Sequence, residues 1–203
     1  NKIVTNQSKI KLLKESKALL VDTFYTINLI NNQNRKVIIT SNQPFLDNQT
    51  DQTINFLVED VVTFSAKKGE NIIYYRIYKE GNDELVKYWL SHTFLPILFT
   101  FEDIYYFLHA GAVEIDSKPI LFVADSFGGK STLTDFFIQK GHTMISDDKV
   151  GVYEDERGII AVPSYAYHRP YRKVEDLGYP VENFAKGAKK MHAIFNLVKS
   201  DEK

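Results

Sequence analysis

The residues with the clearest chemical meaning are Gly128-Gly129-Lys130-Ser131, which follow an apolar run at residues 119–123. The backbone N–H groups of such a small-residue loop, with those of a helix that starts directly after it, favour an anion at one place. Lys130 adds a positive charge for the β- and γ-phosphates of a nucleotide, and Ser131 offers a hydroxyl to Mg²⁺. The sequence therefore predicts a strand, a phosphate-binding loop and a helix, in that order.

The loop departs from the Walker A pattern G-x-x-x-x-G-K-[ST] at its first position, where Ala124 replaces glycine. A small residue with negative φ can still serve there, and the two glycines keep the backbone freedom needed closest to the phosphates. The alternative is a chance Gly-Gly-Lys-Ser at a helix start, which the flanking apolar patterns disfavour. We expect the nucleotide to contact the whole loop: Ala124, Asp125, Ser126, Phe127, Gly128, Gly129, Lys130, Ser131 and Thr132.

Two adjacent carboxylates, Asp147 and Asp148, follow the next predicted strand at residues 142–145. Lys130 and Asp147 are 147 − 130 = 17 positions apart, which is enough for one helix and one strand. Because ligands of open α/β sheets bind at the carboxyl ends of strands, we expect the carboxylates to converge with the loop. Such a pair is often only a solvated turn, but its place after a phosphate loop favours phosphoryl-transfer chemistry.

Four segments between residues 85 and 175 occur in the order seen in a known family. They are residues 109–116, the loop, residues 146–148 and residues 162–165. This part of the chain resembles the catalytic domain of HPr kinase/phosphorylase and its broader relatives, whose core is shared with phosphoenolpyruvate carboxykinase. The resemblance implies a P-loop kinase core, and a transferase that moves a phosphoryl group from ATP or GTP, with Mg²⁺, to a serine-like hydroxyl.

The same resemblance implies roles for individual residues. Asp147 is similar to the general base that takes the proton of the acceptor hydroxyl, and Asp148 would stand beside it on the metal side, with Ser131 as the other metal ligand. His109 resembles the histidine that opens the strand before the loop and faces the phosphates. A purely structural histidine remains the alternative at that position.

The chain also differs from HPr kinase proper. Thr132 stands where that enzyme generally has glutamate, and the later glycine- and arginine-containing signature has no clear counterpart. We therefore expect neither HPr as the substrate nor a phosphorylase reaction. The expected acceptor is a hydroxyl-bearing peptide, protein or small molecule.

Two other functions stay open. A non-catalytic nucleotide-binding regulatory module is suggested by Ala124 and by the unusual Asp125-Ser126-Phe127. A nucleotide hydrolase would use water in place of the hydroxyl acceptor. A nucleic-acid partner is not expected, because the formal net charge of −1 provides no basic field.

The composition fits one α/β domain over residues 1–203, with 44% hydrophobic and 25% charged residues. The absence of cysteine excludes disulfides and thiolate metal sites. No apolar run is long enough to cross a bilayer and no secretory start is present, so we expect no membrane partner. The expected dependence on a nucleotide points to a cytoplasmic protein. A homo-oligomer remains open. A family member would carry more residues after the last predicted strand, so a truncated C-terminus is one expectation.

Hydrophobic periodicity predicts a mixed, β-rich α/β fold in two parts. Residues 1–82 should form an antiparallel, β-rich part after a short helix within residues 1–17, with strands at 18–29, 36–40, 54–58, 61–66 and 71–78 and a turn at 31–34. Residues 83–203 should form the kinase-like core.

In this core we expect Asp83 to cap a helix from Glu84 to about Phe94, and Pro96 to kink or restart it. Further elements should be a strand at 109–115, a helix at 130–140 that buries Leu133, Phe136 and Phe137, a hairpin at 149–162, a helical turn at 174–177 and a strand at 191–198. Arg169 or Arg172 could bind either a phosphate or a surface carboxylate.

Overall fold

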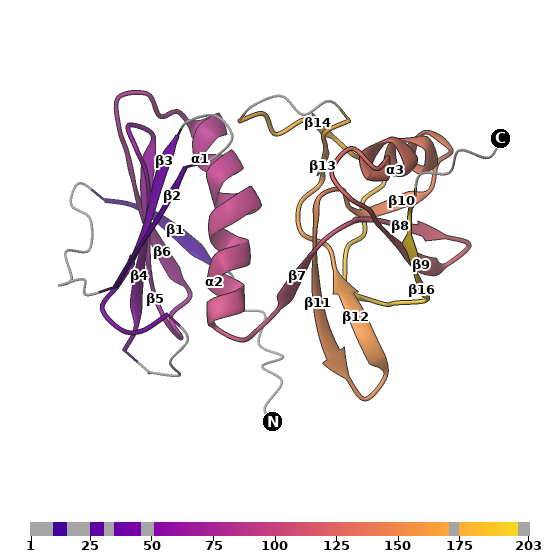
Figure 1. Ribbon diagram of the computed structural model, residues 1–203, viewed down its shortest axis with the longest axis horizontal. Coiled ribbons are helices and arrows are strands. Elements are labelled where there is room, and N and C mark those ends of the chain that lie inside the picture. Colours follow the sequence, from indigo (N-terminus) through magenta and orange to yellow (C-terminus); the bar gives the residue numbers. More distant parts are fainter. Residues whose placement is uncertain (1–9, 16–24, 31–34, 46–50, 171–174, 199–203) are drawn as a thin grey trace. The chain divides into compact units, whose positions relative to one another are not determined.

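The computed structural model describes residues 10–15, 25–30, 35–45, 51–170 and 175–198. The chain divides into two compact units, residues 1–86 and 87–203, and helix α1 (Asp83–Trp89) spans the division (Figure 1). Several sheets and few helices make the fold mixed and β-rich, which confirms the predicted class at this level. The expectations for residues 18–24, for the turn at 31–34 and for Arg172 fall outside the described residues.

The first unit is a six-stranded sheet in the order β1-β6-β5-β4-β3-β2. Its strands are β1 (Lys11–Lys14), β2 (Tyr25–Ile30), β3 (Lys36–Ser41), β4 (Thr53–Val58), β5 (Val62–Lys67) and β6 (Ile72–Ile77). Strands β2 to β6 pair antiparallel, as predicted. Alternate side chains of these strands point to one face, where Phe56 and Phe64 are fully buried.

Strand β1 contradicts the sequence prediction. It pairs parallel with β6, whereas the prediction placed a short helix in this region and only antiparallel pairs in the sheet. The backbone N–H groups of Lys11 and Glu15 donate to the carbonyls of Asn71 and Tyr75, at 2.8 and 3.0 Å. The edge of β6 thus provides hydrogen-bond partners for the backbone of β1, whose groups would otherwise pair within a helix.

Three helical segments follow one another without interruption: α1, the π-helix η1 (Leu90–Phe94) and α2 (Leu95–Phe101). Asn82, not Asp83, caps α1, because its side-chain oxygen accepts the N–H of Leu85 at 2.9 Å. Pro96 lies in the first turn of α2, directly after the π-helical η1, so the helical hydrogen-bond pattern changes where the sequence predicts a kink or restart.

The second unit contains two four-stranded sheets, β10-β8-β9-β16 and β15-β12-β11-β7, and a small β13-β14 pair. The bounds are β7 (Tyr106–His109), β8 (Gly111–Ile115), β9 (Lys118–Val123), α3 (Lys130–Gln139), β10 (Thr143–Ser146), β11 (Lys149–Asp155), β12 (Gly158–Val162), β13 (Tyr167–His168), β14 (Tyr179–Pro180), β15 (Lys189–Lys190) and β16 (Ala193–Asn196). The predicted hairpin at 149–162 is confirmed as β11 and β12.

The single strand predicted at residues 109–115 is two strands in different sheets. His109 ends β7 and pairs with Lys149 of β11, whereas Gly111 begins β8. Ala110 joins the two strands, and its N–H donates to the carbonyl of Asp148 at 3.1 Å. His109 is therefore at the end of a strand rather than at its start.

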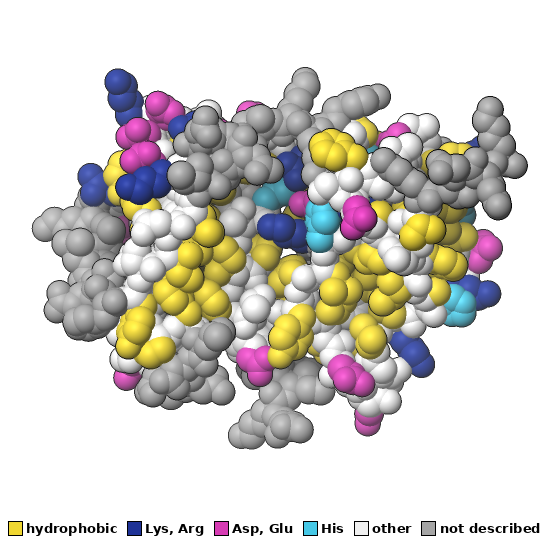
Figure 2. Space-filling view, in the orientation of Figure 1, with side chains coloured by type: hydrophobic (Ala, Val, Ile, Leu, Met, Phe, Trp, Pro, Cys, Tyr) yellow, Lys and Arg dark blue, Asp and Glu magenta, His cyan; other side chains and the backbone are white. Residues whose placement is uncertain are grey.

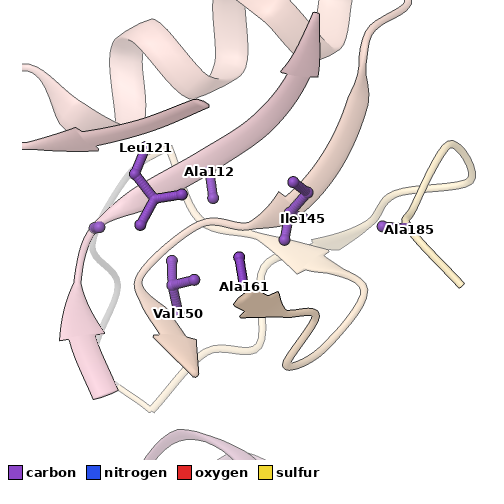
Figure 3. Packing of buried hydrophobic residues seen from close by; sticks show 7 residues of the cluster. Ala112, Leu121, Ile145, Val150, Ala161 and Ala185 are labelled. Atoms are coloured by element: carbon purple, nitrogen blue, oxygen red, sulfur yellow. The ribbon is translucent and has the colours of Figure 1, made fainter. Parts of the chain in front are cut away.

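Small and branched side chains form a buried cluster in the second unit (Figure 3). Its members come from both sheets and the loops beside them: Ala110, Ala112, Leu121, Ile145, Val150, Ala161 and Ala185. Because the alanines bring backbones close together, the ends of β8, β9 and β10 are held in fixed register.

Helix α3 does not bury the face that its apolar residues predicted. Phe137 stacks on Phe122 with ring centroids 5.6 Å apart, but Phe136 is 51% exposed and Leu133 is only partly buried. The buried positions are instead Lys130 and Thr134, which face β8 and the loop. Two C-terminal expectations also change: residues 175–177 are not helical, and the last strand is limited to Ala193–Asn196.

Acidic and basic side chains are interspersed on the face shown in Figure 2, with hydrophobic side chains among them. Such a mixture agrees with the small net charge of the sequence. Among the described residues, no helix has both the length and the hydropathy that a membrane span requires.

Candidate active site

One edge of the β10-β8-β9-β16 sheet gathers the residues that the sequence selected. Strand β8 is antiparallel to both β9 and β10, so β9 and β10 are parallel and their carboxyl ends lie at the same edge. The loop 124–129 follows β9, Asp147 and Asp148 follow β10, and β8 begins between them at Gly111. This edge is where open α/β sheets bind ligands.

The loop backbone needs its two glycines for different reasons. Gly129 directly precedes α3 and has φ of 89°. Residues with a Cβ rarely adopt this conformation. A Cβ at Gly128 would lie 2.6 Å from the Cβ of Ala124 and 2.9 Å from the carbonyl oxygen of Asp125. Phe127 also has positive φ, at 63°, and its side chain is 85% exposed. The tight turn therefore depends on the small residues around it.

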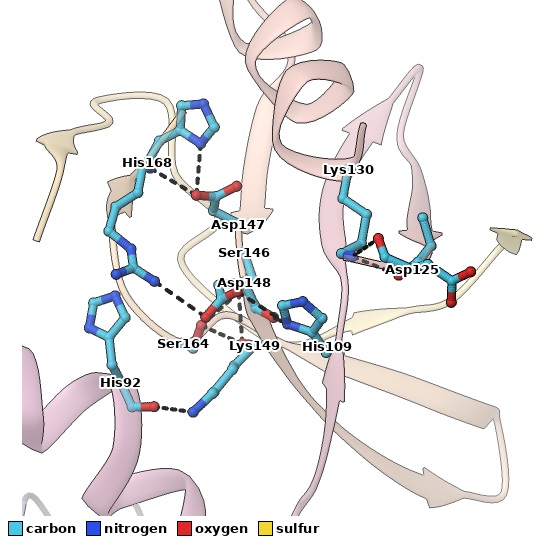
Figure 4. A network of polar contacts seen from close by, with 12 residues as sticks. His92, His109, Asp125, Lys130, Ser146, Asp147, Asp148, Lys149, Ser164 and His168 are labelled. Atoms are coloured by element: carbon cyan, nitrogen blue, oxygen red, sulfur yellow. Dashed lines mark hydrogen bonds and ion pairs between the residues drawn. The ribbon is translucent and has the colours of Figure 1, made fainter. Parts of the chain in front are cut away.

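Lys130 is buried and lies against the loop that precedes it. Its ammonium donates to the carbonyl oxygens of Ala124 at 2.7 Å and Asp125 at 3.2 Å (Figure 4). Ser131 is partly buried and Thr132 is exposed in the first turn of α3. The first N–H groups of an α-helix have no partner within the helix, so this end offers donors to an anion.

Two hydroxyls hold the turn that carries the carboxylates. Ser146 and Ser164 both donate to the carbonyl of Lys149, at 2.7 and 2.8 Å, and their hydroxyl oxygens are 2.8 Å apart. The turn at Asp147 and Asp148 is thus tied to the strand that precedes it and to the segment after β12.

Asp148 lies among basic side chains. Its carboxylate oxygens lie 3.1 Å from His109 Nδ1 and 3.4 Å from a guanidinium nitrogen of Arg169. Burial acts to raise the pKa of Asp148, but the hydrogen bond from His109 and the charges of Arg169 and Lys149 outweigh it and hold that pKa well below its usual range. Asp148 is therefore a fully ionised carboxylate whose oxygens are already engaged, and Arg169 binds it rather than standing free for a phosphate.

Asp147 has one engaged oxygen and one that is not. Oδ2 accepts the backbone N–H of Arg169 at 2.8 Å and lies 3.0 Å from His168 Nδ1. Oδ1 is buried and has no hydrogen-bond partner among the residues that the structure describes. The carboxylate is thus held through one atom, and the other has an unused acceptor capacity within the described structure.

His168 is the residue of this site that the sequence analysis missed. Its ring is fully buried, and Nε2 lies 3.2 Å from Asp135 Oδ1 on α3 while Nδ1 faces Asp147. Within the described chain neither contact has hydrogen-bond alignment, so both are close electrostatic contacts. The only sequence signal was the run of aromatic, His and Arg residues at 165–172, which does not distinguish one histidine.

A second buried histidine, His92, lies beside these groups. Its ring stacks on Tyr88 at a centroid distance of 4.6 Å and lies 4.2 Å from the ring of Tyr165, while its carbonyl accepts the ammonium of Lys149. Burial first, and then the positive charge of Arg169, lower its pKa to about 3. His92 is therefore a neutral imidazole packed against the site.

The buried His92 predicts a specific acid sensitivity. The pKa of His92 in the folded protein lies below the ordinary value of 6.5. Between these two pKa values only the unfolded chain binds the proton, so the free energy of unfolding decreases as the pH is lowered. The contribution is complete above about pH 6.5 and is lost toward pH 3, at no more than about 1.4 kcal/mol per pH unit. We expect the free energy of unfolding, measured with urea, to decrease more between pH 7 and pH 5 in wild type than in His92→Phe.

The exposed His192 supplies the control for that experiment. His192→Gln should keep the wild-type slope of unfolding free energy against pH. Equal slopes for wild type and His92→Phe would contradict the neutral, buried state assigned to His92.

The metal-ligating potential of the site is limited. Among the described residues no cluster of three or more His, Asp or Glu side chains could hold an ion. Mg²⁺ usually binds through one or two protein oxygens together with substrate phosphates, so Ser131, with or without Asp148, fits a metal that arrives with a nucleotide. Asp148 would have to exchange its contacts with His109 or Arg169 to take part.

Comparison with known proteins identifies no family for this chain. No family model matches it, and no curated protein matches it. A solved structure of the HPr(Ser) kinase/phosphatase from Coxiella burnetii is similar over 48% of this chain and 68% of that chain, with 21% identity and a TM-score of 0.39. At this score the likeness assigns neither family nor activity, and any function has to be inferred from the chain's own residues.

Proposed function

We propose that residues 87–203 bind a nucleoside triphosphate with Mg²⁺ at the loop 124–132 and transfer its γ-phosphoryl group to a hydroxyl of a peptide, protein or small molecule. The observation that carries this proposal is the common sheet edge, at which both the loop after β9 and the carboxylates after β10 lie. The order of motifs in the sequence, which resembles that of HPr kinase-like proteins, agrees with it.

Each group at the edge has a task in such a reaction. The ammonium of Lys130 would leave the carbonyls of Ala124 and Asp125 for the phosphates, and the first N–H groups of α3 would bind the same oxygens. Ser131 would hold Mg²⁺, which when bound supplies positive charge to the phosphate oxygens. The protein then has to position the hydroxyl and accept its proton.

Asp147 is better suited than Asp148 to accept that proton. Oδ1 of Asp147 has no partner in the described structure, whereas both oxygens of Asp148 contact His109 or Arg169. The lowered pKa of Asp148 also makes that carboxylate a weak base. We therefore assign proton acceptance to Asp147, and to Asp148 with His109 and Arg169 the organisation of charge beside it.

Nucleotide binding is the first test of this function. Calorimetry with ATP and GTP, with and without Mg²⁺, should show magnesium-dependent binding by wild type. Lys130→Ala removes a charge-assisted contact and should weaken binding by roughly 10- to 100-fold. Lys118→Ala, at the exposed lysine that begins β9, should bind like wild type. Equal affinities for all three proteins would remove the loop from the site.

The two alternative functions give different results in the next assay. Tight binding without turnover across many hydroxyl acceptors would indicate a regulatory nucleotide-binding module. Phosphate release that does not fall when acceptors are added would indicate a hydrolase. A phosphorylated acceptor, detected by mass spectrometry, would support the kinase.

A further inference from the structure

We propose that His168 is a positioning residue that holds the Asp147 carboxylate in register with α3, the helix that begins at Lys130. The inference rests on the proposed function, because it concerns how the proposed base is oriented. It assigns a role in the reaction to a histidine that lies outside every sequence motif described above.

The position of His168 between two carboxylates carries the proposal. Nδ1 is 3.0 Å from Asp147 Oδ2 (Figure 4). Nε2 is 3.2 Å from Asp135 Oδ1, and the ring is fully buried. A neutral imidazole donates from one nitrogen and an imidazolium donates from both. In either state the ring places at least one N–H close to the two carboxylates that it lies between, the buried Asp147 and the partly exposed Asp135.

The far end of this chain of contacts is fixed to the helix. Asp135 lies on α3, and its Oδ1 also accepts the hydroxyl of Tyr179 at 2.6 Å. Tyr179 pairs with His168 across β13 and β14, and the two rings meet edge-on with centroids 5.3 Å apart. A Cβ at Gly178 would collide with the carbonyl of His168, so the backbone there packs closely. The imidazole is therefore held on several sides.

The consequence for Asp147 is a defined orientation. The Arg169 N–H donates to Oδ2 and the His168 ring lies against the same oxygen. These two contacts restrict rotation of the carboxylate and so fix the orientation of Oδ1. Since α3 also carries Lys130 and Ser131 in its first turn, the same contacts keep the base in register with the phosphate site. A catalytic group displaced by about 1 Å can lose roughly 100-fold in rate.

Two substitutions at His168 test its two ring nitrogens separately. His168→Asn places an amide nitrogen near the position of Nδ1 and keeps the contact with Asp147. His168→Gln places it near Nε2 and loses that contact. Single-turnover loss of the γ-phosphate from Mg·ATP, with water as the acceptor, should fall roughly 10- to 100-fold in His168→Gln and clearly less in His168→Asn. ATP affinity from calorimetry should match wild type in both variants, as should the rate of the control His192→Gln.

The outcomes divide cleanly. A wild-type rate in His168→Gln, or equal losses in both variants, would overturn the positioning role while leaving the proposed function in place. A wild type that neither binds nor turns over Mg·ATP would overturn the proposed function and this inference with it. If both His168 variants fail to fold, Asp135→Asn replaces them: slower turnover at unchanged ATP affinity supports the role, and wild-type turnover refutes it.

Discussion

Replacement of Asp147 by asparagine is expected to slow phosphoryl transfer by about 10²- to 10⁴-fold, the usual contribution of a general base. The amide has nearly the shape of the carboxylate, but it cannot take the proton that the buried Oδ1 would accept. Nucleotide affinity should change little, because Asp147 is held by His168 and Arg169 rather than by the loop. Rapid-quench measurement of γ-phosphate loss, with calorimetry in parallel, separates the two quantities.

The control for this prediction is Asp116→Asn, at an exposed turn position with φ of 49° that asparagine tolerates well. It should transfer phosphate at the wild-type rate. An Asp147→Asn protein that also does so would remove the assigned base. If that result were found, Asp148 would be the remaining candidate for the general base.

Replacement of Gly111 by alanine is expected to reduce the free energy of unfolding by about 1–3 kcal/mol, the usual cost of overpacking. A Cβ at this position would meet Thr134 Oγ1 well inside contact distance, because α3 packs directly over the first residue of β8. That hydroxyl donates to the carbonyl of Lys130 at 2.9 Å, so the strain falls on the first turn of the helix. Urea unfolding followed by circular dichroism measures the loss.

Two further variants test the cause of this loss. Gly187→Ala should be as stable as wild type, because no described atom lies within 4 Å of the added Cβ. Thr134→Ala, introduced together with Gly111→Ala, should recover much of the lost stability by removing the colliding hydroxyl. If Gly111→Ala alone proves as stable as wild type, the close packing of α3 on β8 is not rigid.

Local sequence patterns predicted elements whose cause is also local. The hairpin predicted at residues 149–162 is present as β11 and β12, and Gly158 at its turn has φ of 107°, a conformation that glycine adopts easily. The helix predicted at residues 130–140 is present as α3, and the glycine that follows it, Gly141, has φ of 86°, which is typical after a helix end. In both cases the deciding interactions lie within a few residues, so the sequence contains them.

Predictions failed where a distant segment decides the result. Strand β1 forms because the edge of β6 offers it backbone partners, and Phe136 remains half exposed because α3 turns Thr134 toward β8. The break at Ala110 arises because one chain segment passes between two sheets. No local periodicity contains this information.

The candidate site divides in the same way. The sequence by itself determined the strand–loop–helix order around Lys130 and the adjacent carboxylates after the next strand, because residue types and spacing carry both signals. The tertiary structure alone decided which aspartate keeps a free oxygen, and it alone brought His168 between Asp147 and Asp135. The physical reason is burial: a histidine 21 positions after Asp147 (168 − 147 = 21) acquires its partners only when β13 and α3 pack around it.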